Sequence, residues 1–181
     1  LGGSGFLGEY FHHYLQSIQA EPVVISRSRP CFNCTWHEMS NIELLKNQLE
    51  HISPMLIINC AAIASHEKCE AHPEKAFSVN AYLPSVLARW CNFHRIKFIQ
   101  ISSDSVFSGS DKFPFSETSD VSPIGIYAQS KMKGEKLVML NSAESIICRT
   151  NFFGWNRRCE GILDFFYDNL KRKNNCFGYK D

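Results

Sequence analysis

Three side chains near the middle of the chain have the types and the spacing to act on a carbonyl or alcohol oxygen. Tyr127 and Lys131 are four residues apart, so a helix over residues 126–140 places both on one face. A nearby ammonium lowers the pKa of a phenol from about 10, which allows it to exchange protons near neutral pH. The Ser103 hydroxyl would hydrogen-bond the same oxygen. The alternative is that a tyrosine and a lysine share this spacing by chance on an exposed helix.

The element that must position Ser103 is a strand. The apolar run from Ile96 to Ile101 predicts a buried strand that ends at the hydroxyl pair Ser102 and Ser103. Open parallel sheets bind their ligands at the carboxyl ends of their strands. We therefore expect chemistry where this strand ends.

A glycine turn opens the chain. Residues 1–8 read LGGSGFLG, and their glycines match two spacings typical of turns in which the backbone approaches a pyrophosphate. The helix pattern over residues 6–18 would place the phosphates at its N-terminus. Taken alone the pattern is weak evidence, because the strand that should precede it is absent from the sequence.

Arg27 follows the next predicted strand, residues 22–26, and no acidic residue accompanies it. At this place in a dinucleotide-binding fold an acid binds the ribose hydroxyls, whereas an arginine accommodates a 2′-phosphate. The sequence thus favours NADP(H) over NAD(H). The alternative is that this arginine only solvates a loop.

Two further features bear on a dinucleotide site. A strongly apolar strand over residues 54–60 leads into Ala61, Ala62 and Ile63, whose small or apolar side chains would let a dinucleotide lie across the strand end. Asn80 falls among apolar residues in a helix pattern that starts at Glu67, includes Pro73 as a possible first-turn proline and runs to about Phe93. A buried amide there needs a hydrogen-bond partner.

Strands and helices alternate along the chain, which predicts an α/β fold of the Rossmann type: a doubly wound parallel sheet with helices on both faces. We expect residues 1–149 to form the NADP-binding domain without its first strand, and residues 150–181 to begin a truncated substrate-binding portion. Residues 174–181 resemble the start of a strand, so we expect a piece of a longer chain. Residues 31–39 are expected to be irregular, and the remaining elements are a strand over 145–148 and helices over 41–51 and 162–170.

Composition narrows the class of protein. The 181 residues carry 19 basic and 18 acidic side chains and are 44% hydrophobic. This supports one substantial core and gives no electrostatic sign of nucleic acid or membrane as a partner. Several of the eight cysteines lie in apolar patterns, which indicates free thiols in a reducing cytoplasm. Cys31, Cys34 and His37 could supply three zinc ligands, but no second pair is suitably spaced, and we expect no metal.

Several motifs fall in one order along nearly the whole chain. They are GGSGFLG at 2–8, INCAAIASHEKCEAHPEKAFSVNA at 58–81, ISSDSVFSG at 101–109, PIGIYAQSKMKGE at 123–135 and RTNFFGWN at 149–156. In this combination the chain resembles the extended short-chain dehydrogenase/reductase superfamily, and more narrowly the dTDP-4-dehydrorhamnose reductase family. The resemblance implies reduction of a 4-keto-6-deoxy sugar nucleotide with NAD(P)H in dTDP-rhamnose biosynthesis.

The resemblance also assigns roles to residues. It makes Tyr127 the proton donor to the sugar carbonyl, Lys131 the ligand of the nicotinamide ribose and Ser103 a hydrogen-bond partner of the carbonyl oxygen. Asn80 matches an asparagine that holds the active-site helix and a proton-relay water. The expected cofactor-binding residues are Gly2, Gly5, Phe6, Leu7, Gly8, Arg27, Ala61, Ala62, Ile63, Ser102, Tyr127 and Lys131.

Departures and alternatives accompany the resemblance. Many relatives carry an aspartate where this chain offers His37 and Glu38, so the adenine contact stays open. Dehydratases of the superfamily have an acidic pair where this chain has Asp104 and Ser105, which argues against dehydration. Two other functions fit the pattern: a non-catalytic NADP-binding subunit like the beta subunit of methionine adenosyltransferase, and a nucleotide-sugar epimerase. The resemblance leaves a homodimer open.

Overall fold

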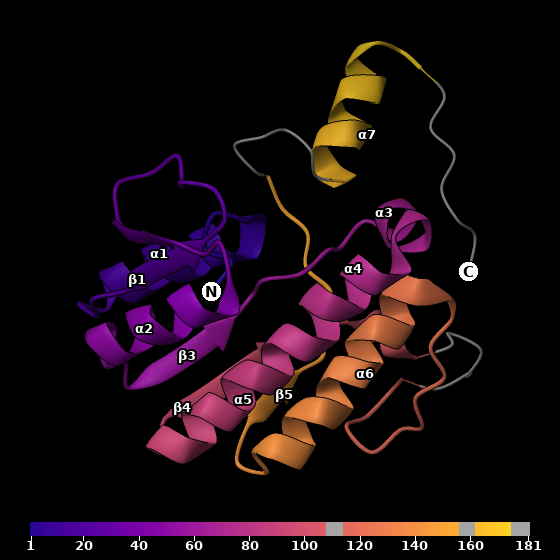
Figure 1. Cartoon of the computed structure of the whole chain (residues 1–181). Helices are drawn as coiled ribbons and strands as arrows, with labels where there is room; N and C mark the ends of the chain where they lie inside the picture. Colours follow the sequence, from indigo (N-terminus) through magenta and orange to yellow (C-terminus); the bar gives the residue numbers. More distant parts are fainter. Residues whose placement is uncertain (108–113, 156–161, 175–181) are drawn as a thin grey trace. The chain divides into compact units, whose positions relative to one another are not determined.

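The computed structural model describes residues 1–107, 114–155 and 162–174 (Figure 1). The chain divides into two compact units, Leu1–Thr150 and Asn151–Asp181. The second unit contains helix α7, Ile162–Lys171. The strand expected over residues 174–181 lies almost wholly outside the described residues.

The described strands are all paired in parallel, as alternating strands and helices predict. Strand β1, Val23–Ser26, pairs with β2, Thr35–Glu38, and a second sheet has the order β3, Leu56–Asn59, then β4, Lys97–Ile101, then β5, Ile146–Cys148. The expectation that residues 31–39 are irregular is wrong at β2. All of β2 pairs with β1. The amino-acid composition of residues 35–38 does not predict this strand, because its pairing partner lies elsewhere in the sequence.

The first two residues join these two sheets. The Leu1 amino group donates to the Ile58 carbonyl at 2.6 Å, and the Cys60 amide donates to the Leu1 carbonyl at 3.0 Å. The Gly2 amide donates to the Ile25 carbonyl at 2.8 Å. Leu1 and Gly2 therefore lie between β1 and β3.

The described residues of the first unit form six further helices and two short helical segments. The expected helix from Glu67 to Phe93 is interrupted, because His72 leaves the helical conformation (φ −139°, ψ 69°) and the backbone widens to a π-helix around Asn80. Pro73 lies in the first turn of a helix, as expected. The elements are α1, Phe6–Ser17; α2, Ile42–Ile52; α3, His66–Ala71; α4, Pro73–Phe77; the π-helix η1, Ser78–Tyr82; α5, Leu83–His94; the 3₁₀ helix η2, Asp104–Val106; and α6, Gly125–Asn141.

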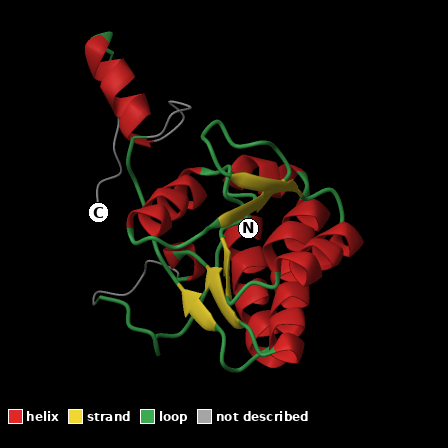
Figure 2. Ribbon diagram, turned by 90° about the vertical axis from the view of Figure 1, so that its left-hand side faces the viewer, coloured by secondary structure: helices red, strands yellow, loops and turns green. Residues whose placement is uncertain are grey.

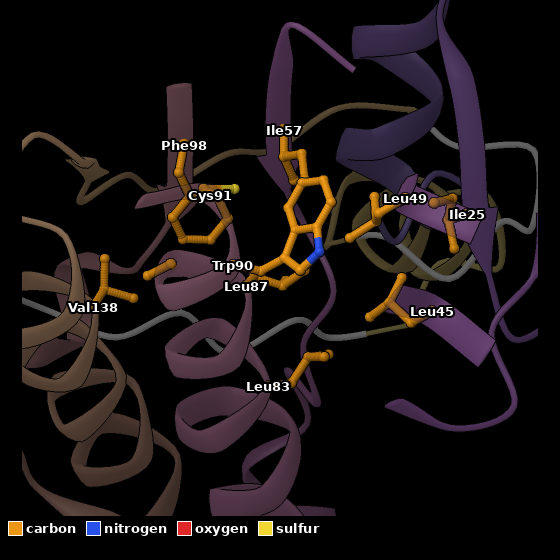
Figure 3. Close-up of a cluster of buried hydrophobic side chains, with 11 residues drawn as sticks. Ile25, Leu45, Leu49, Ile57, Leu83, Leu87, Trp90, Cys91, Phe98 and Val138 are labelled. Atoms are coloured by element: carbon orange, nitrogen blue, oxygen red, sulfur yellow. The ribbon is translucent and has the colours of Figure 1, made fainter. Parts of the chain in front are cut away.

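The hydrophobic core lies between the strands and three helices, α2, α5 and α6. Figure 3 shows the Trp90 indole of α5 between Phe98 of β4 and Leu49 of α2. The indole nitrogen donates to Glu50 Oε1 at 3.2 Å, so the ring is buried with its polar atom satisfied. The other members of the cluster are Ile25, Leu45, Ile57, Leu83, Leu87, Ala88, Cys91 and Val138.

Helices cover both faces of the strands (Figure 2). Ile25 belongs to the cluster under α2, whereas its neighbour Val24 lies against Gly3, at the turn that leads into α1. The parallel strands and the helices that alternate with them confirm the predicted α/β architecture.

Within the described ranges, no helix combines the length and the apolar character needed to cross a bilayer.

Candidate active site

The first turn of α6 places Tyr127 at the carboxyl end of β4. Gly125 has a φ of +81°, a left-handed conformation that suits glycine, and the amide of Ile126 donates to Glu70 Oε1 at 2.7 Å. A carboxylate at a helix N-terminus is favourable because it meets the positive end of the helix dipole. Glu70 of α3 therefore holds the start of the helix that carries the phenol.

Tyr127 and Ser103 are brought together, as the sequence predicts. The Ser103 hydroxyl lies close enough to the phenol to act on its pKa. The Ser103 hydroxyl also caps η2, accepting from the Ser105 amide at 3.2 Å and donating to Asp104 Oδ1 at 3.1 Å. The same hydroxyl lies 3.1 Å from Ser105 Oγ, and Ser103 is nearly inaccessible to solvent.

The expected lowering of the Tyr127 pKa is wrong for this structure. Burial raises the pKa of the phenol, the negative charge of Asp104 and the Cys69 thiol raise it further, and the Ser103 hydroxyl opposes them. Burial dominates because the phenolate loses hydration that the neighbouring groups do not replace. Tyr127 therefore carries its proton at neutral pH, as a general acid must.

Lys131 is buried one helical turn after Tyr127 and is only 4% exposed. Its Nζ donates to the Ile101 carbonyl at 2.7 Å, so the ammonium lies against the last residue of β4. Burial lowers the pKa of Lys131 to about 8, while the carboxylate of Glu135 and the Cys60 thiol act to raise it. Lys131 is thus mostly protonated at neutral pH, but its pKa lies much closer to neutrality than that of a free lysine.

Asn80 finds the partner that a buried amide requires. Its Oδ1 accepts from the Ile63 amide at 2.8 Å, and its Nδ2 donates to the Ile63 carbonyl and to Ser130 Oγ, both at 3.0 Å. Ser130 in turn donates to the Tyr127 carbonyl at 2.7 Å. Asn80 therefore ties the segment after β3 to the active-site helix, and the π-helix around it sets the amide at this junction.

The glycine turn and the segment after β3 approach each other at backbone distance. Gly2 has a φ of +74°, and a Cβ there would lie 2.6 Å from the Ala61 amide nitrogen. A Cβ on Gly8 would overlap the Gly2 carbonyl oxygen and the Gly3 Cα. The same segment continues through Ala62 to Ile63, so the turn meets the part of the chain that Asn80 holds. Only glycine fits this close turn, which is the requirement of a pyrophosphate-binding backbone.

The other expected cofactor residues lie around this turn. Gly5 is the N-cap of α1, followed by Phe6 and Leu7 in its first turn. Ser4 Oγ lies 3.3 Å from Ser28 Oγ, which places the turn beside the loop that carries the exposed Arg27.

The Ser102 hydroxyl is directed at Glu135, not at Tyr127 or Ser103. Its hydroxyl donates to Glu135 Oε1 at 2.5 Å, and the other carboxylate oxygen accepts from Arg149 Nη2 at 2.9 Å. Sequence reasoning assigned no role to Glu135 or Arg149. The available signal was the spacing of Glu135, four residues after Lys131 on the same helix.

His66 and Ser130 were also missed. The His66 ring lies 4.7 Å from the Tyr127 ring, centroid to centroid, and its side chain is exposed. Nothing in the local sequence indicates this contact, because it joins α3 to α6.

Cys31, Cys34 and His37 do not form a metal centre. Across the part of the chain that the structure describes, no group of three or more His, Cys, Asp or Glu side chains is arranged to hold a metal ion. The six described cysteines are all free.

Comparison with known proteins identifies relatives along nearly the whole chain. The family model described as RmlD substrate binding domain matches residues 1–174. The probable low-salt glycan biosynthesis reductase Agl14 of Haloferax volcanii is 34% identical over 155 residues, which cover 83% of this chain and 51% of that protein. The dTDP-4-dehydrorhamnose reductase of Escherichia coli is 32% identical over 115 residues, which cover 64% of this chain and 38% of the enzyme.

A solved structure is similar to this chain over nearly its whole length. The chain resembles the crystal structure of a hypothetical dTDP-4-dehydrorhamnose reductase from Sulfolobus tokodaii with a TM-score of 0.86 at 28% identity, covering 99% of this chain and 63% of that one. The chain thus spans about half the length, or less, of the curated relatives it matches.

Proposed function

The chain belongs to the RmlD substrate binding domain family of extended short-chain dehydrogenase/reductases, and from this membership and the site geometry we propose that the protein reduces a nucleotide-activated 4-keto-6-deoxy sugar. The observation that carries the proposal is the contact between Tyr127 and Ser103 at the end of β4, with the buried Lys131 one turn further along α6. Relatives named as dTDP-4-dehydrorhamnose reductases support the substrate class.

The chain has the features that a nicotinamide dinucleotide requires. Gly2 and Gly8 leave room at the turn that side chains would fill, and α1 begins directly after it. Arg27 follows β1 without an acidic neighbour, which supports NADP(H) over NAD(H). When bound, the reduced nicotinamide supplies a hydride to the carbonyl carbon.

The protein's own residues supply the proton and the orientation. Tyr127 is the proposed proton donor, because its raised pKa keeps the phenol protonated until negative charge develops on the substrate oxygen. Ser103 would donate to the same oxygen and restrict its position. Lys131 would bind the nicotinamide ribose, and Asn80 holds Tyr127 through Ser130.

The test is turnover of NADPH on a dTDP-4-keto-6-deoxy sugar by the purified protein. We expect Tyr127→Phe to lower kcat by about 10²–10⁴-fold, the usual contribution of a positioned general acid. Tyr14→Phe is the matched control, since Tyr14 is an exposed tyrosine of α1. Full turnover by Tyr127→Phe would refute the proton-donor role. Consumption of no keto sugar, together with tight NADP binding, would instead favour a non-catalytic NADP-binding subunit.

The coenzyme preference has its own test. We expect Arg27→Ala to raise KM for NADPH at least about tenfold and to leave KM for NADH unchanged, because only the former carries the 2′-phosphate. Arg89→Ala removes an exposed arginine from α5 and serves as the control. Equal effects on the two coenzymes would contradict the assignment of Arg27.

The expected location belongs to the same proposal. Free thiols at all six described cysteines support a protein of the reducing cytoplasm, where disulfides are rare.

A further inference from the structure

The Glu135 carboxylate joins three elements at the carboxyl edge of the β3-β4-β5 sheet. It extends from α6 and accepts a 2.5 Å hydrogen bond from Ser102 Oγ, which follows β4. Arg149, which follows β5, donates from Nη2 to Oε2 at 2.9 Å and from Nε to Oε1 at 3.1 Å. Glu135 itself is 5% exposed, so all of its hydrogen-bonding capacity is directed into the protein.

Arg149 and Glu135 form a bidentate ion pair, a geometry that gives strong hydrogen bonds. A guanidinium that donates two bonds to one carboxylate fixes the plane of both groups. The guanidinium carbon of Arg149 also lies 5.1 Å from the Phe107 ring centroid, within the range of a cation–π contact. Because Arg149 remains 25% exposed at its side chain, the buried partner is Glu135. The pair therefore fixes the Glu135 carboxylate inside the protein, one helical turn after Lys131.

Lys131 is the buried lysine on the same helix as this charge, whereas Lys133 and Lys136 are exposed. Its ammonium is held at the Ile101 carbonyl, which also accepts from Gln100 Nε2 at 2.8 Å. Two ionisable groups raise the pKa of Lys131 against the effect of burial: Glu135 on its own helix and Cys60 in the segment after β3. Burial raises the pKa of the Cys60 thiol, so that group is neutral at pH 7. The Glu135 carboxylate bonds Ser102 and the Lys131 ammonium bonds Ile101, so the two charged groups lie at adjacent residues of the strand end, and Glu135 favours the ammonium.

We propose that Glu135 is a positioning residue of the site: its buried carboxylate, held by Arg149 and Ser102, keeps Lys131 in its charged form at the end of β4. The catalytic consequence rests on the proposed function, because it matters only where Lys131 acts with Tyr127. The effect on Lys131 itself does not depend on any reaction.

The direct experiment measures the titration of Lys131 in the whole chain by NMR of ¹³Cε-labelled lysine, with the Lys131→Arg variant used to assign its signal. Glu135→Gln keeps the shape of the side chain and removes its charge. We expect the acid dissociation constant of Lys131 to rise at least about tenfold. Ser102→Ala removes one hydrogen bond but no charge and should leave this constant within about threefold. Glu144→Gln, an exposed acid, is the control for charge alone.

A second variant guards against misfolding. Glu135→Gln leaves Arg149 without its partner, whereas Glu135→Gln combined with Arg149→Met removes both charges together. The double variant also removes the Arg149 cation, so the acid dissociation constant of Lys131 should rise by less than in Glu135→Gln. An unchanged Lys131 titration in whichever of the two variants folds would overturn the proposal and leave Glu135 a purely structural residue.

Turnover separates this inference from the proposed function. If the protein reduces a keto sugar, the alkaline limb of its kcat/KM profile should move to lower pH in Glu135→Gln by the same factor as the Lys131 titration. A limb that stays in place while Lys131 shifts would overturn the catalytic consequence. If the wild-type protein reduces no keto sugar, the proposed function fails, and the NMR titration still decides the role of Glu135.

Discussion

Helices α5 and α6 pack side by side against the same strands, yet they bury opposite kinds of residue (Figure 1). The buried side chains of α5 are Leu83, Pro84, Leu87, Ala88, Trp90 and Cys91. Those of α6 are Ala128, Ser130, Lys131, Gly134, Glu135 and Val138. One helix mainly excludes water from the core, and the other carries an ammonium, a carboxylate and a hydroxyl into the protein.

The comparison shows where this chain gives up stability for chemistry. Burial of the α5 side chains is favourable in proportion to their apolar area. Burial of Lys131 and Glu135 is favourable only to the extent that hydrogen bonds and opposite charges replace lost hydration. Changes in α5 should therefore act on stability, whereas changes in the polar residues of α6 should separate stability from activity.

The largest expected effect on stability is in α5. Leu87 is 1% exposed, and Leu87→Ala should lower the free energy of unfolding by about 3 kcal/mol through lost burial and a residual cavity. Urea denaturation followed by circular dichroism measures this. Leu140→Ala, at an exposed leucine of α6, should change it by less than about 0.5 kcal/mol. Similar losses for the two variants would contradict the assignment of the core to α5.

Gly134→Ala tests the closeness of α6 to the π-helix. A Cβ at this position would overlap the Asn80 carbonyl oxygen and lie 3.3 Å from the Ala81 Cα. We expect a loss of about 2 kcal/mol in the free energy of unfolding, because backbone must move to admit the methyl group. Helix propensity alone predicts the opposite sign, a gain of about 1 kcal/mol. A stabilised variant would therefore disprove the close approach. Lys133→Ala, on the exposed face, is the control.

Lys131→Met should stabilise the protein at neutral pH by about 2 kcal/mol and abolish turnover. The pKa of Lys131 falls from 10.5 to about 8 on folding, a shift that corresponds to about 3 kcal/mol, and loss of the bond to Ile101 offsets part of the gain.

The pH dependence of this difference has a defined sign. Below pH 8 the folded protein carries the full cost of a buried ammonium, and this cost disappears as the pH rises from about 8 to 10.5. The stability advantage of Lys131→Met should therefore shrink over that interval. Comparing the two proteins cancels other groups, such as the Cys91 thiol, whose pKa burial raises to about 12. A constant difference across the interval would contradict the lowered pKa.

The smallest effect compares two serines, one on each helix. Ser130 accepts from Asn80 and donates to the Tyr127 carbonyl, whereas Ser85 of α5 accepts from Asn141 Nδ2 at 3.1 Å. Ser130→Ala and Ser85→Ala should each lower the free energy of unfolding by about 1 kcal/mol. Only Ser130→Ala should also reduce kcat, because it releases Tyr127 from Asn80. Equal turnover in the two variants would argue against this positioning path.

Much of the architecture could be predicted from local patterns. Apolar runs gave the positions of β1, β3, β4 and β5, and helical periodicity gave α1, α2, α6 and α7. The strand β2 was missed because its only support is a ladder with β1. Pro73 is confirmed as a first-turn proline, whereas the π-helix at Asn80 was missed because a helical pattern does not show where its backbone widens.

The sequence by itself determined which chemical groups share a surface: Tyr127 and Lys131 on one face of α6, Ser103 at the end of β4, and glycines where the backbone turns. These relations follow from helix and strand geometry over a few residues. Only the tertiary structure decided how those groups are held and charged. The raised pKa of Tyr127, the lowered pKa of Lys131 and the bonds of Glu135 to Arg149 and Ser102 all depend on solvent excluded by distant segments. The hydration that an ionisable group loses depends on all the segments packed around it, and a local stretch of sequence does not show which segments these are.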